Sequence, residues 1–219
     1  MGYGTGMKKL SPCSERTVLD ALTAVCPAPR RLLDAGCGRG ERLAAIGAAL
    51  PGTARFGTEL DAENAAAARA NCPGAAIVTG DVHALSWADG FFDAALCECT
   101  LSLLDAPELC LAELHRVLIP GGTLLLSDLV SASAAPLRTL LSPDGAVRYL
   151  ASRSWTEAAL AAAGFRIRAF RDCREEYLTM AAQMIFDCDG SCVGPEAFAA
   201  LRRERAGYGL WTLERSAGI

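Results

Sequence analysis

The chain has 219 residues, of which 52% are hydrophobic, and its mean hydropathy is +0.24. This composition excludes an intrinsically disordered chain and favours a single domain over 1–219, because it supplies enough apolar surface for one sizeable core. The net charge is −4 and the basic residues are scattered, which favours a small-molecule substrate over a nucleic-acid partner. No apolar run reaches the roughly 20 residues of a membrane span, and residues 1–10 lack the apolar core of a signal peptide, so we expect a cytoplasmic protein.

The hydrophobic pattern predicts helices and strands that alternate along the chain. Apolar residues at helical spacing predict an N-terminal helix over 14–25, and the apolar run 31–35 predicts a buried strand, followed by a glycine-rich turn and a helix over about 40–50. This alternation is typical of an α/β fold, a doubly wound and mostly parallel sheet with helices on both faces. Further strands are expected at 54–59, 75–79, 92–97, 123–128, 165–170 and 208–215, and further helices at 62–71, 106–118, 155–163, 174–187 and 195–206.

The turn after the first predicted strand is the most informative motif. The strand leads into Asp34, and Gly36, Gly38 and Gly40 follow at alternate positions. Glycines are needed where the backbone takes a positive φ or lets a ligand approach closely, and open α/β sheets bind ligands at this end of the first strand. A dinucleotide fingerprint has a further glycine where this chain has Glu41, whose carboxylate would repel a pyrophosphate. The motif therefore favours a ligand without phosphate.

The pattern D-x-G-x-G-x-G from Asp34 to Gly40 resembles motif I of the class I S-adenosylmethionine (SAM)-dependent methyltransferases. Residues 79–82 and 113–122 resemble later motifs of the same family, in order and at the family's spacing. The similarity is to the branch of small-molecule methyltransferases that includes the ubiquinone and menaquinone enzymes. It implies a Rossmann-like seven-stranded sheet whose seventh strand is antiparallel and enters beside the sixth. It also implies SAM as cofactor, S-adenosyl-L-homocysteine as product and a small-molecule acceptor.

The resemblance also implies roles for single residues. Glu59 lies about 20 residues beyond Gly40, the spacing of a ribose-binding acid, and would accept hydrogen bonds from both ribose hydroxyls. Asp61 is a less suitable candidate for the ribose-binding acid, because its position fits a helix N-cap. Asp81 would bind the adenine amino group and the backbone N–H of Val82 the adenine ring. Trp87 could pack beside the adenine ring or belong to the hydrophobic core. The cofactor-binding residues predicted in this way are Asp34, Gly36, Cys37, Gly38, Gly40, Glu59, Leu60, Asp81, Val82 and Cys97.

The methyl acceptor is expected beside the end of the fourth predicted strand, at Glu98 and Cys99. Methyl transfer is a direct displacement in which positioning supplies much of the rate. Glu98 is a candidate general base if burial raises its pKa, and it could equally cap the following loop.

A substrate-binding lid is expected from the insert 171–207 and the segment 129–153, because both leave the sheet at its ligand-binding edge. Helical spacing puts Tyr177 and Met184 on one face of the insert, and both are candidate substrate contacts. The alternative is that this face only packs on the sheet.

The cysteines allow a second enzyme hypothesis. The segment 92–102, with Cys99, is similar to a stretch of the arsenite methyltransferases that carries one of their three metalloid-binding thiols, and soft thiolates suit a soft metalloid. The family's third cysteine, soon after the fifth strand, is missing. No paired C-x-x-C zinc motif occurs, and we predict no metal site. In this second hypothesis the other metalloid-binding thiols would be Cys13 or Cys26, with Cys188 and Cys192 as substitutes if the lid folds back.

A third hypothesis is a SAM-binding protein without catalysis.

Overall fold

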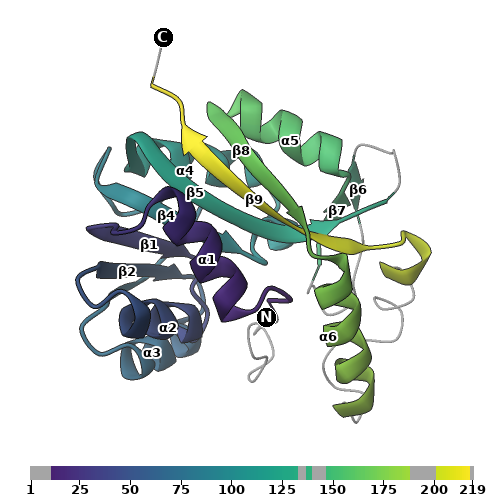
Figure 1. Ribbon diagram of the computed structural model, residues 1–219, viewed down its shortest axis with the longest axis horizontal. Helices are drawn as coiled ribbons and strands as arrows, with labels where there is room; N and C mark the ends of the chain where they lie inside the picture. The colour runs from purple at the N-terminus through teal and green to yellow at the C-terminus, as the bar shows by residue number, and fades with distance from the viewer. Residues whose placement is uncertain (1–10, 133–136, 140–146, 188–200, 218–219) are drawn as a thin grey trace.

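A seven-stranded sheet forms the centre of the computed structural model, which describes residues 11–132, 137–139, 147–187 and 201–217 (Figure 1). Its strands are β1 (Arg31–Ala35), β2 (Ala54–Glu59), β3 (Ala76–Thr79), β4 (Phe92–Glu98), β5 (Leu118–Val130), β8 (Phe165–Asp172) and β9 (Gly207–Arg215). They follow the order β3-β2-β1-β4-β5-β9-β8. The pairs among β1 to β5 are parallel, and β9 is antiparallel to both β5 and β8. The predicted Rossmann-like sheet with an antiparallel last strand is confirmed.

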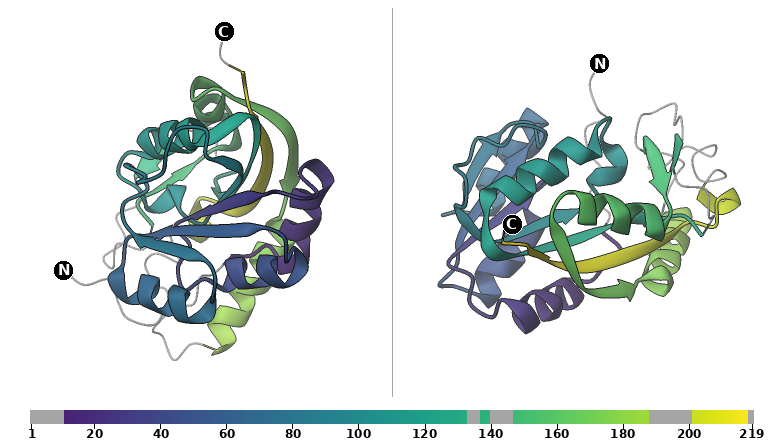
Figure 2. Two further views of the ribbon diagram at one scale, coloured as in Figure 1. Left: turned by 90° about the vertical axis from the view of Figure 1, so that its left-hand side faces the viewer. Right: turned by 90° about the horizontal axis from the view of Figure 1, so that it is seen from above.

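Helices cover both faces of the sheet, as the two views in Figure 2 show. The helices are α1 (Glu15–Val25), α2 (Glu41–Ala49), α3 (Ala62–Asn71), α4 (Pro107–Val117), α5 (Arg153–Ala162) and α6 (Arg174–Asp187). Side chains of α1, α2, α3 and α6 share one apolar core, and those of α4 and α5 share another. Neighbouring strand residues alternate between the two: Leu32 enters the first core and Leu33 the second, both without solvent exposure.

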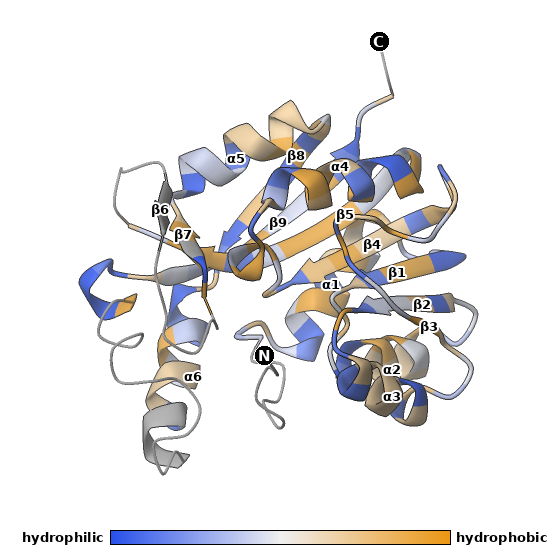
Figure 3. Ribbon diagram, turned by 180° about the vertical axis from the view of Figure 1, so that it is seen from behind, coloured by the Kyte–Doolittle hydropathy of each residue, from blue (hydrophilic) through white to orange (hydrophobic). Residues whose placement is uncertain are grey.

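The apolar residues follow the central strands β1, β4 and β5, whereas the helices mix hydrophilic and apolar residues (Figure 3). Such helices are amphipathic and stabilise the fold by burying one face. Within the described ranges, no helix combines the length and the apolar character that crossing a membrane requires.

Capping side chains fix where three of the helices begin. Oγ of Ser14 accepts a hydrogen bond from the N–H of Thr17 at 3.1 Å, and α1 starts at the next residue. Oδ1 of Asp61 accepts one from the N–H of Asn64 at 2.8 Å at the start of α3, the N-cap role expected for this acid. Ser152 caps α5 in the same way. These caps satisfy N–H groups that have no partner inside the helix.

The start of β5 differs from the sequence prediction. A helix over 106–118 and a separate strand at 123–128 were predicted, but α4 ends at Val117 and β5 begins at Leu118 and continues through the Pro-Gly-Gly run at 120–122. The register with β4 shifts there, since Leu118 faces Phe92 and Thr123 faces Ala94. The extra residues on β5 form a local irregularity like a β-bulge, after which the pairing of β4 with β5 continues.

The elements expected to form a lid lie around the end of the sheet where β9 begins. Helix α6 follows β8 and extends beyond the sheet in Figure 1. Strands β6 (Leu137–Thr139) and β7 (Tyr149–Ala151) form a separate antiparallel pair within the second predicted lid segment. Most of the helix predicted at 195–206 lies outside the described residues, although 201–203 are helical.

Candidate functional site

The glycine-rich turn after β1 is tied to the end of β2. The N–H groups of Gly36 and Cys37 both donate to the carbonyl oxygen of Thr58, at 2.8 and 3.1 Å. Gly36 has a φ of +75°, and a Cβ on it would lie 2.5 Å from Oγ1 of Thr100. Backbone conformation and space therefore both exclude a side chain, and the turn stays close to the strand ends.

Glu59, the last residue of β2, holds the next part of the turn. Its Oε2 accepts a hydrogen bond from the N–H of Gly38 at 2.8 Å, and its Oε1 accepts one from the N–H of Asp61 at 3.0 Å. Gly38 has a φ of +55°, and Gly40, with a φ of +86°, is the N-cap of α2. Each carboxylate oxygen can accept a further hydrogen bond, so Glu59 can still bind ligand hydroxyls. The acid and the turn form one hydrogen-bonded unit.

The residues after β3 lie at the same edge of the sheet. Oδ1 of Asp81 accepts a hydrogen bond from the N–H of His83 at 2.9 Å and lies 2.7 Å from its Nδ1, so the acid is fixed in place. Val82 is buried. Leu60, directly after Glu59, is 61% exposed, which is high for a large apolar side chain. A ligand with an apolar ring that packed on Leu60 would bury this exposed side chain.

Trp87 lies in an aromatic cluster behind this edge. Its ring contacts Phe56, Phe91 and Phe92, with centroid distances of 5.3, 6.4 and 5.7 Å. Its Nε1–H donates to Oγ1 of Thr58 at 3.1 Å. Both ends of the side chain are therefore engaged by the protein, and of the two interpretations of Trp87 the contacts favour the core.

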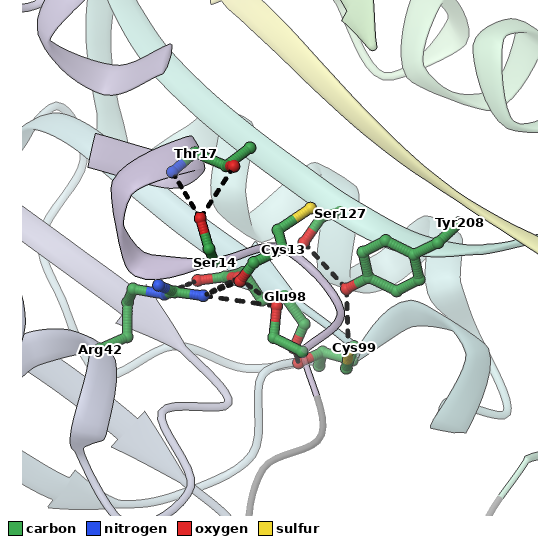
Figure 4. Close-up of polar contacts among 10 residues, drawn as sticks. Cys13, Ser14, Thr17, Arg42, Glu98, Cys99, Ser127 and Tyr208 are labelled. Atoms are coloured by element: carbon green, nitrogen blue, oxygen red, sulfur yellow. Dashed lines mark hydrogen bonds and ion pairs between the residues drawn. The ribbon is translucent and has the colours of Figure 1, made fainter. Parts of the chain in front are cut away.

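Glu98, at the end of β4, forms a buried ion pair with Arg42 of α2. Nε and Nη2 of Arg42 donate to the two carboxylate oxygens at 2.6 and 2.9 Å (Figure 4). Oγ of Ser11 also donates to Oε2, at 2.8 Å. The two side chains are 8% and 1% exposed. The bidentate arginine forms charge-assisted hydrogen bonds to both carboxylate oxygens, the atoms that a general base would use. These contacts argue for a structural role and against the general-base hypothesis for Glu98.

Cys99 follows β4 in a left-handed backbone conformation, with a φ of +49°. Its Sγ lies 2.8 Å from the hydroxyl oxygen of Tyr208, which lies 3.0 Å from Oγ of Ser127 (Figure 4). Burial raises the pKa of the Tyr208 phenol well above its ordinary value, so the phenol stays protonated. Non-glycine residues in this region are strained, and such strain is common at functional sites.

The other candidate thiols are not gathered around Cys99 as a metalloid site requires. Cys13 contacts Cys173, with 3.3 Å between the two sulfurs, and Cys26 is partly exposed at the end of α1. Cys188 and Cys192 lie outside the described residues. Among the residues that are described, no cluster of three or more His, Cys, Asp or Glu side chains suits a metal ion.

The two predicted substrate contacts lie on α6. Tyr177 is buried in the core shared by α1 and α2, and this burial raises the pKa of its phenol. That position favours the packing role. The side chain of Met184 lies outside the described part of the chain. The remaining predicted cofactor residues, Asp34, Cys37 and Cys97, are fully buried at or beside the strand ends.

Comparison with known proteins identifies the family. Residues 33–126 match the Methyltransferase domain family. A malonyl-[acyl-carrier protein] O-methyltransferase from Methylococcus capsulatus is 31% identical over 192 residues, which are 84% of this chain and 70% of that protein. The chain belongs to the class I SAM-dependent methyltransferases. This confirms the family, and with it SAM as the cofactor, that the sequence motifs predicted.

Two further matches are to a protein sequence and to a solved structure. An uncharacterised 37.1 kDa protein of transposon TN4556 from Streptomyces fradiae is 35% identical over 115 residues, but the match spans only 33% of that protein and 51% of this chain. The structure of geranyl diphosphate C-methyltransferase from Streptomyces coelicolor, in complex with S-adenosyl-L-homocysteine, superposes with a TM-score of 0.75 at 16% identity. That match covers 92% of this chain and 79% of the other, and it supports the fold.

The edge of the sheet fits SAM in this member of the family. Glycine N–H groups, a carboxylate with spare acceptor capacity and an exposed leucine suit a ligand that has hydroxyls and an aromatic ring but no phosphate. Sequence reasoning missed Arg42 as the partner of Glu98, although a signal was present. Arg42 lies four residues before Ile46, a spacing that places both side chains on the buried face of α2.

Proposed function

We propose that the chain transfers the methyl group of SAM to a small-molecule acceptor by direct displacement. The observation that carries this proposal is the hydrogen bond between Gly38 and Glu59, which joins the glycine turn and the strand-end acid. When bound, SAM supplies a methyl carbon on a positively charged sulfur, and S-adenosyl-L-homocysteine is the product. The protein's contribution is to hold the two reactants in line.

Four residues bind and orient the cofactor in this proposal. Glu59 accepts hydrogen bonds from the ribose hydroxyls with the lone pairs that Gly38 and Asp61 leave open. Asp81 accepts from the adenine amino group, and the N–H of Val82 donates to the ring. Leu60 packs against the adenine face, which explains its large exposed fraction of 61% in the protein alone. The methionine end lies along the glycine turn.

The acceptor belongs to a class that needs no proton removed before it reacts. The carboxyl next to Cys99, that of Glu98, is held by both Nε and Nη2 of Arg42 and is therefore not available as a base. An acceptor that is ionised at neutral pH, such as a carboxylate, supplies its own lone pair. The O-methyltransferase named for malonyl-[acyl-carrier protein] is a relative whose named substrate contains such a group.

Cys99 borders the acceptor in this proposal. It directly follows β4, its side chain is half-buried, and Tyr208 holds the thiol in one direction. Tyr177 and Met184 remain proposed acceptor contacts from α6. Replacing a residue that contacts only the acceptor lowers turnover while SAM affinity stays the same, because the cofactor contacts are unchanged.

An assay of S-adenosyl-L-homocysteine formation tests the proposal. The acceptors are malonyl thioesters with a free carboxylate, their methyl esters, small hydroxyl and amine compounds, and arsenite. We expect product with a carboxylate acceptor and none with its ester. SAM binding without turnover of any acceptor would favour the non-catalytic hypothesis, and turnover of arsenite alone would favour the metalloid one.

Variants separate the acceptor site from the cofactor site in the same assay. Cys99→Ala and Tyr177→Ala should each lower turnover about tenfold or more at unchanged SAM affinity, the loss expected for one contact of about 1.4 kcal/mol in the transition state. Leu109→Ala, an exposed residue of α4 on the other face of the sheet, is the matched control. Equal loss of turnover and SAM affinity in Tyr177→Ala, with a large fall in melting temperature, would assign that residue to the core alone.

A further inference from the structure

Two thiols from distant parts of the chain lie in contact where helices α1 and α6 begin. Sγ of Cys13 is 3.3 Å from Sγ of Cys173, although the residues are 160 positions apart in sequence. The first is 2% exposed and the second is fully buried. Cys13 comes directly before Ser14, the N-cap of α1, and Cys173 comes directly before α6. The pair therefore joins the starts of two helices, one of them in the predicted lid.

The separation and the surroundings suit disulfide chemistry. A disulfide bond is about 2.05 Å long, so the sulfurs must approach by little more than about 1 Å. The hydrogen bond from Cys13 lowers the pKa of the Cys173 thiol, and the positive charge of Arg171 acts in the same direction. The same hydrogen bond and burial raise the pKa of Cys13. Cys173 is thus the thiol that ionises first and attacks, because the thiolate is the nucleophile.

We propose that Cys13 and Cys173 are a modification site that forms a reversible disulfide with a low-molecular-weight disulfide, such as glutathione disulfide, as oxidant. The thiolate of Cys173 attacks one sulfur of the oxidant, the oxidant's S–S bond breaks, and one small thiolate leaves. Cys13 then attacks Sγ of Cys173, and the second small thiolate leaves. The protons of the two cysteines end on the two small thiols. Two protein thiols are oxidised and one small disulfide is reduced.

The disulfide would act on the candidate site through the segment before α1. The carbonyl oxygen of Cys13 accepts a hydrogen bond from Nη2 of Arg42 at 3.0 Å, and Ser11 contacts Glu98. These residues line one cavity of about 260 Å³. Oxidation would tie this segment to the start of α6 covalently and restrict the movement of one relative to the other. Small oxidants reach the buried pair when the segment opens locally.

Thiol mapping of the whole protein tests this inference. The folded protein is incubated with glutathione disulfide and then denatured, so that every remaining free thiol is alkylated, and its peptides are analysed by mass spectrometry. We expect a loss of two free thiols per chain, a peptide that links residues 13 and 173, and full reversal by dithiothreitol. Cys13→Ser and Cys173→Ser should each abolish the link, whereas Cys26→Ser, a partly exposed cysteine at the other end of α1, should retain it.

The wild-type result decides the inference even if a variant fails to fold. Complete alkylation of both Cys13 and Cys173 after oxidation would overturn it. So would a link confined to Cys188 and Cys192, because those thiols would then be the redox-active pair. Retention of the link in Cys13→Ser would also overturn it, since another cysteine would be the partner of Cys173.

Discussion

Oε2 of Glu59 accepts a hydrogen bond from the backbone N–H of Gly38 at 2.8 Å. This contact joins the ends of two neighbouring parallel strands, β1 and β2, through the turn that follows the first and the acid that ends the second. A ligand bound across both would meet a site whose two halves are already fixed relative to each other. Less conformational entropy is then lost on binding, which favours affinity.

Gly38→Ala should weaken SAM binding while the protein stays folded. Gly38 has a φ of +55°, and a non-glycine residue there costs about 1–2 kcal/mol. Relaxation of this strain would pull the N–H away from Glu59 and move the acid. We expect SAM affinity to fall about tenfold or more by calorimetry, while the far-UV circular dichroism stays nearly unchanged. Gly38→Val should abolish binding.

The control for the glycine variants is Gly52→Ala. A Cβ on Gly52 would have nothing within 4 Å, and its φ lies outside the left-handed range. This variant should bind SAM with wild-type affinity. Retained binding in Gly38→Val would mean that the loop is a structural turn only and does not contact the cofactor.

Arg42→Met should destabilise the protein strongly. It leaves the carboxylate of Glu98, which is 1% exposed, without its cation, and breaking a buried pair in this way costs about 3–5 kcal/mol. The double variant Arg42→Met/Glu98→Met should recover much of this loss, because an apolar pair of similar volume needs no compensating charge. Urea unfolding measures both. Recovery would be absent if Arg42 acted only through its contact with the Cys13 carbonyl.

The exposed pair of Arg16 and Asp20 provides the control for that comparison. Their side chains are 91% and 69% exposed, and ion pairs of this kind contribute about 0.2–1 kcal/mol. Arg16→Ala should therefore change the free energy of unfolding by less than about 1 kcal/mol.

Glu113→Gln should make stability less dependent on acid pH. Hydrogen bonds from Arg116 and from the N–H of Leu85 lower the pKa of the Glu113 carboxyl below its ordinary value. The stabilisation is present above the unfolded-state pKa, about 4.3, and is lost as pH falls through the lower folded-state pKa. At pH 7 the variant should be about 1–3 kcal/mol less stable. Chemical denaturation should show this gap closing in acid; a constant gap would contradict the assignment.

The sequence predicted the parts of the structure that depend on local pattern. The mainly apolar runs at 31–35 and 92–97 match β1 and most of β4, because such runs are typical of strands buried on both faces. The turn at Gly36 and the N-cap at Asp61 were found because their backbone geometry limits the residue type. The position of β9 came from the family resemblance, since periodicity does not determine strand order.

The sequence did not predict contacts between distant residues. Nothing local pairs Arg42 with Glu98 or Cys13 with Cys173, because each pair depends on how α1, α2 and α6 pack against the sheet. The same limit applies to the acceptor side of the site. Cys99 was recognised, but its partner Tyr208 comes from a strand 109 residues later.

Calorimetric titration of SAM into the wild type, Glu59→Gln and Glu108→Gln tests the central claim most directly. Glutamine keeps the size of Glu59 but removes its charge and one acceptor, and a hydrogen bond to a charged group contributes about 1.5–3 kcal/mol. Glu108 is the control. It is an exposed glutamate of α4, which packs on the face of the sheet opposite to α2 and α3. We predict an affinity loss of about tenfold to a hundredfold for Glu59→Gln and none for Glu108→Gln. Equal affinity in all three proteins would contradict the assignment of this edge as the SAM site.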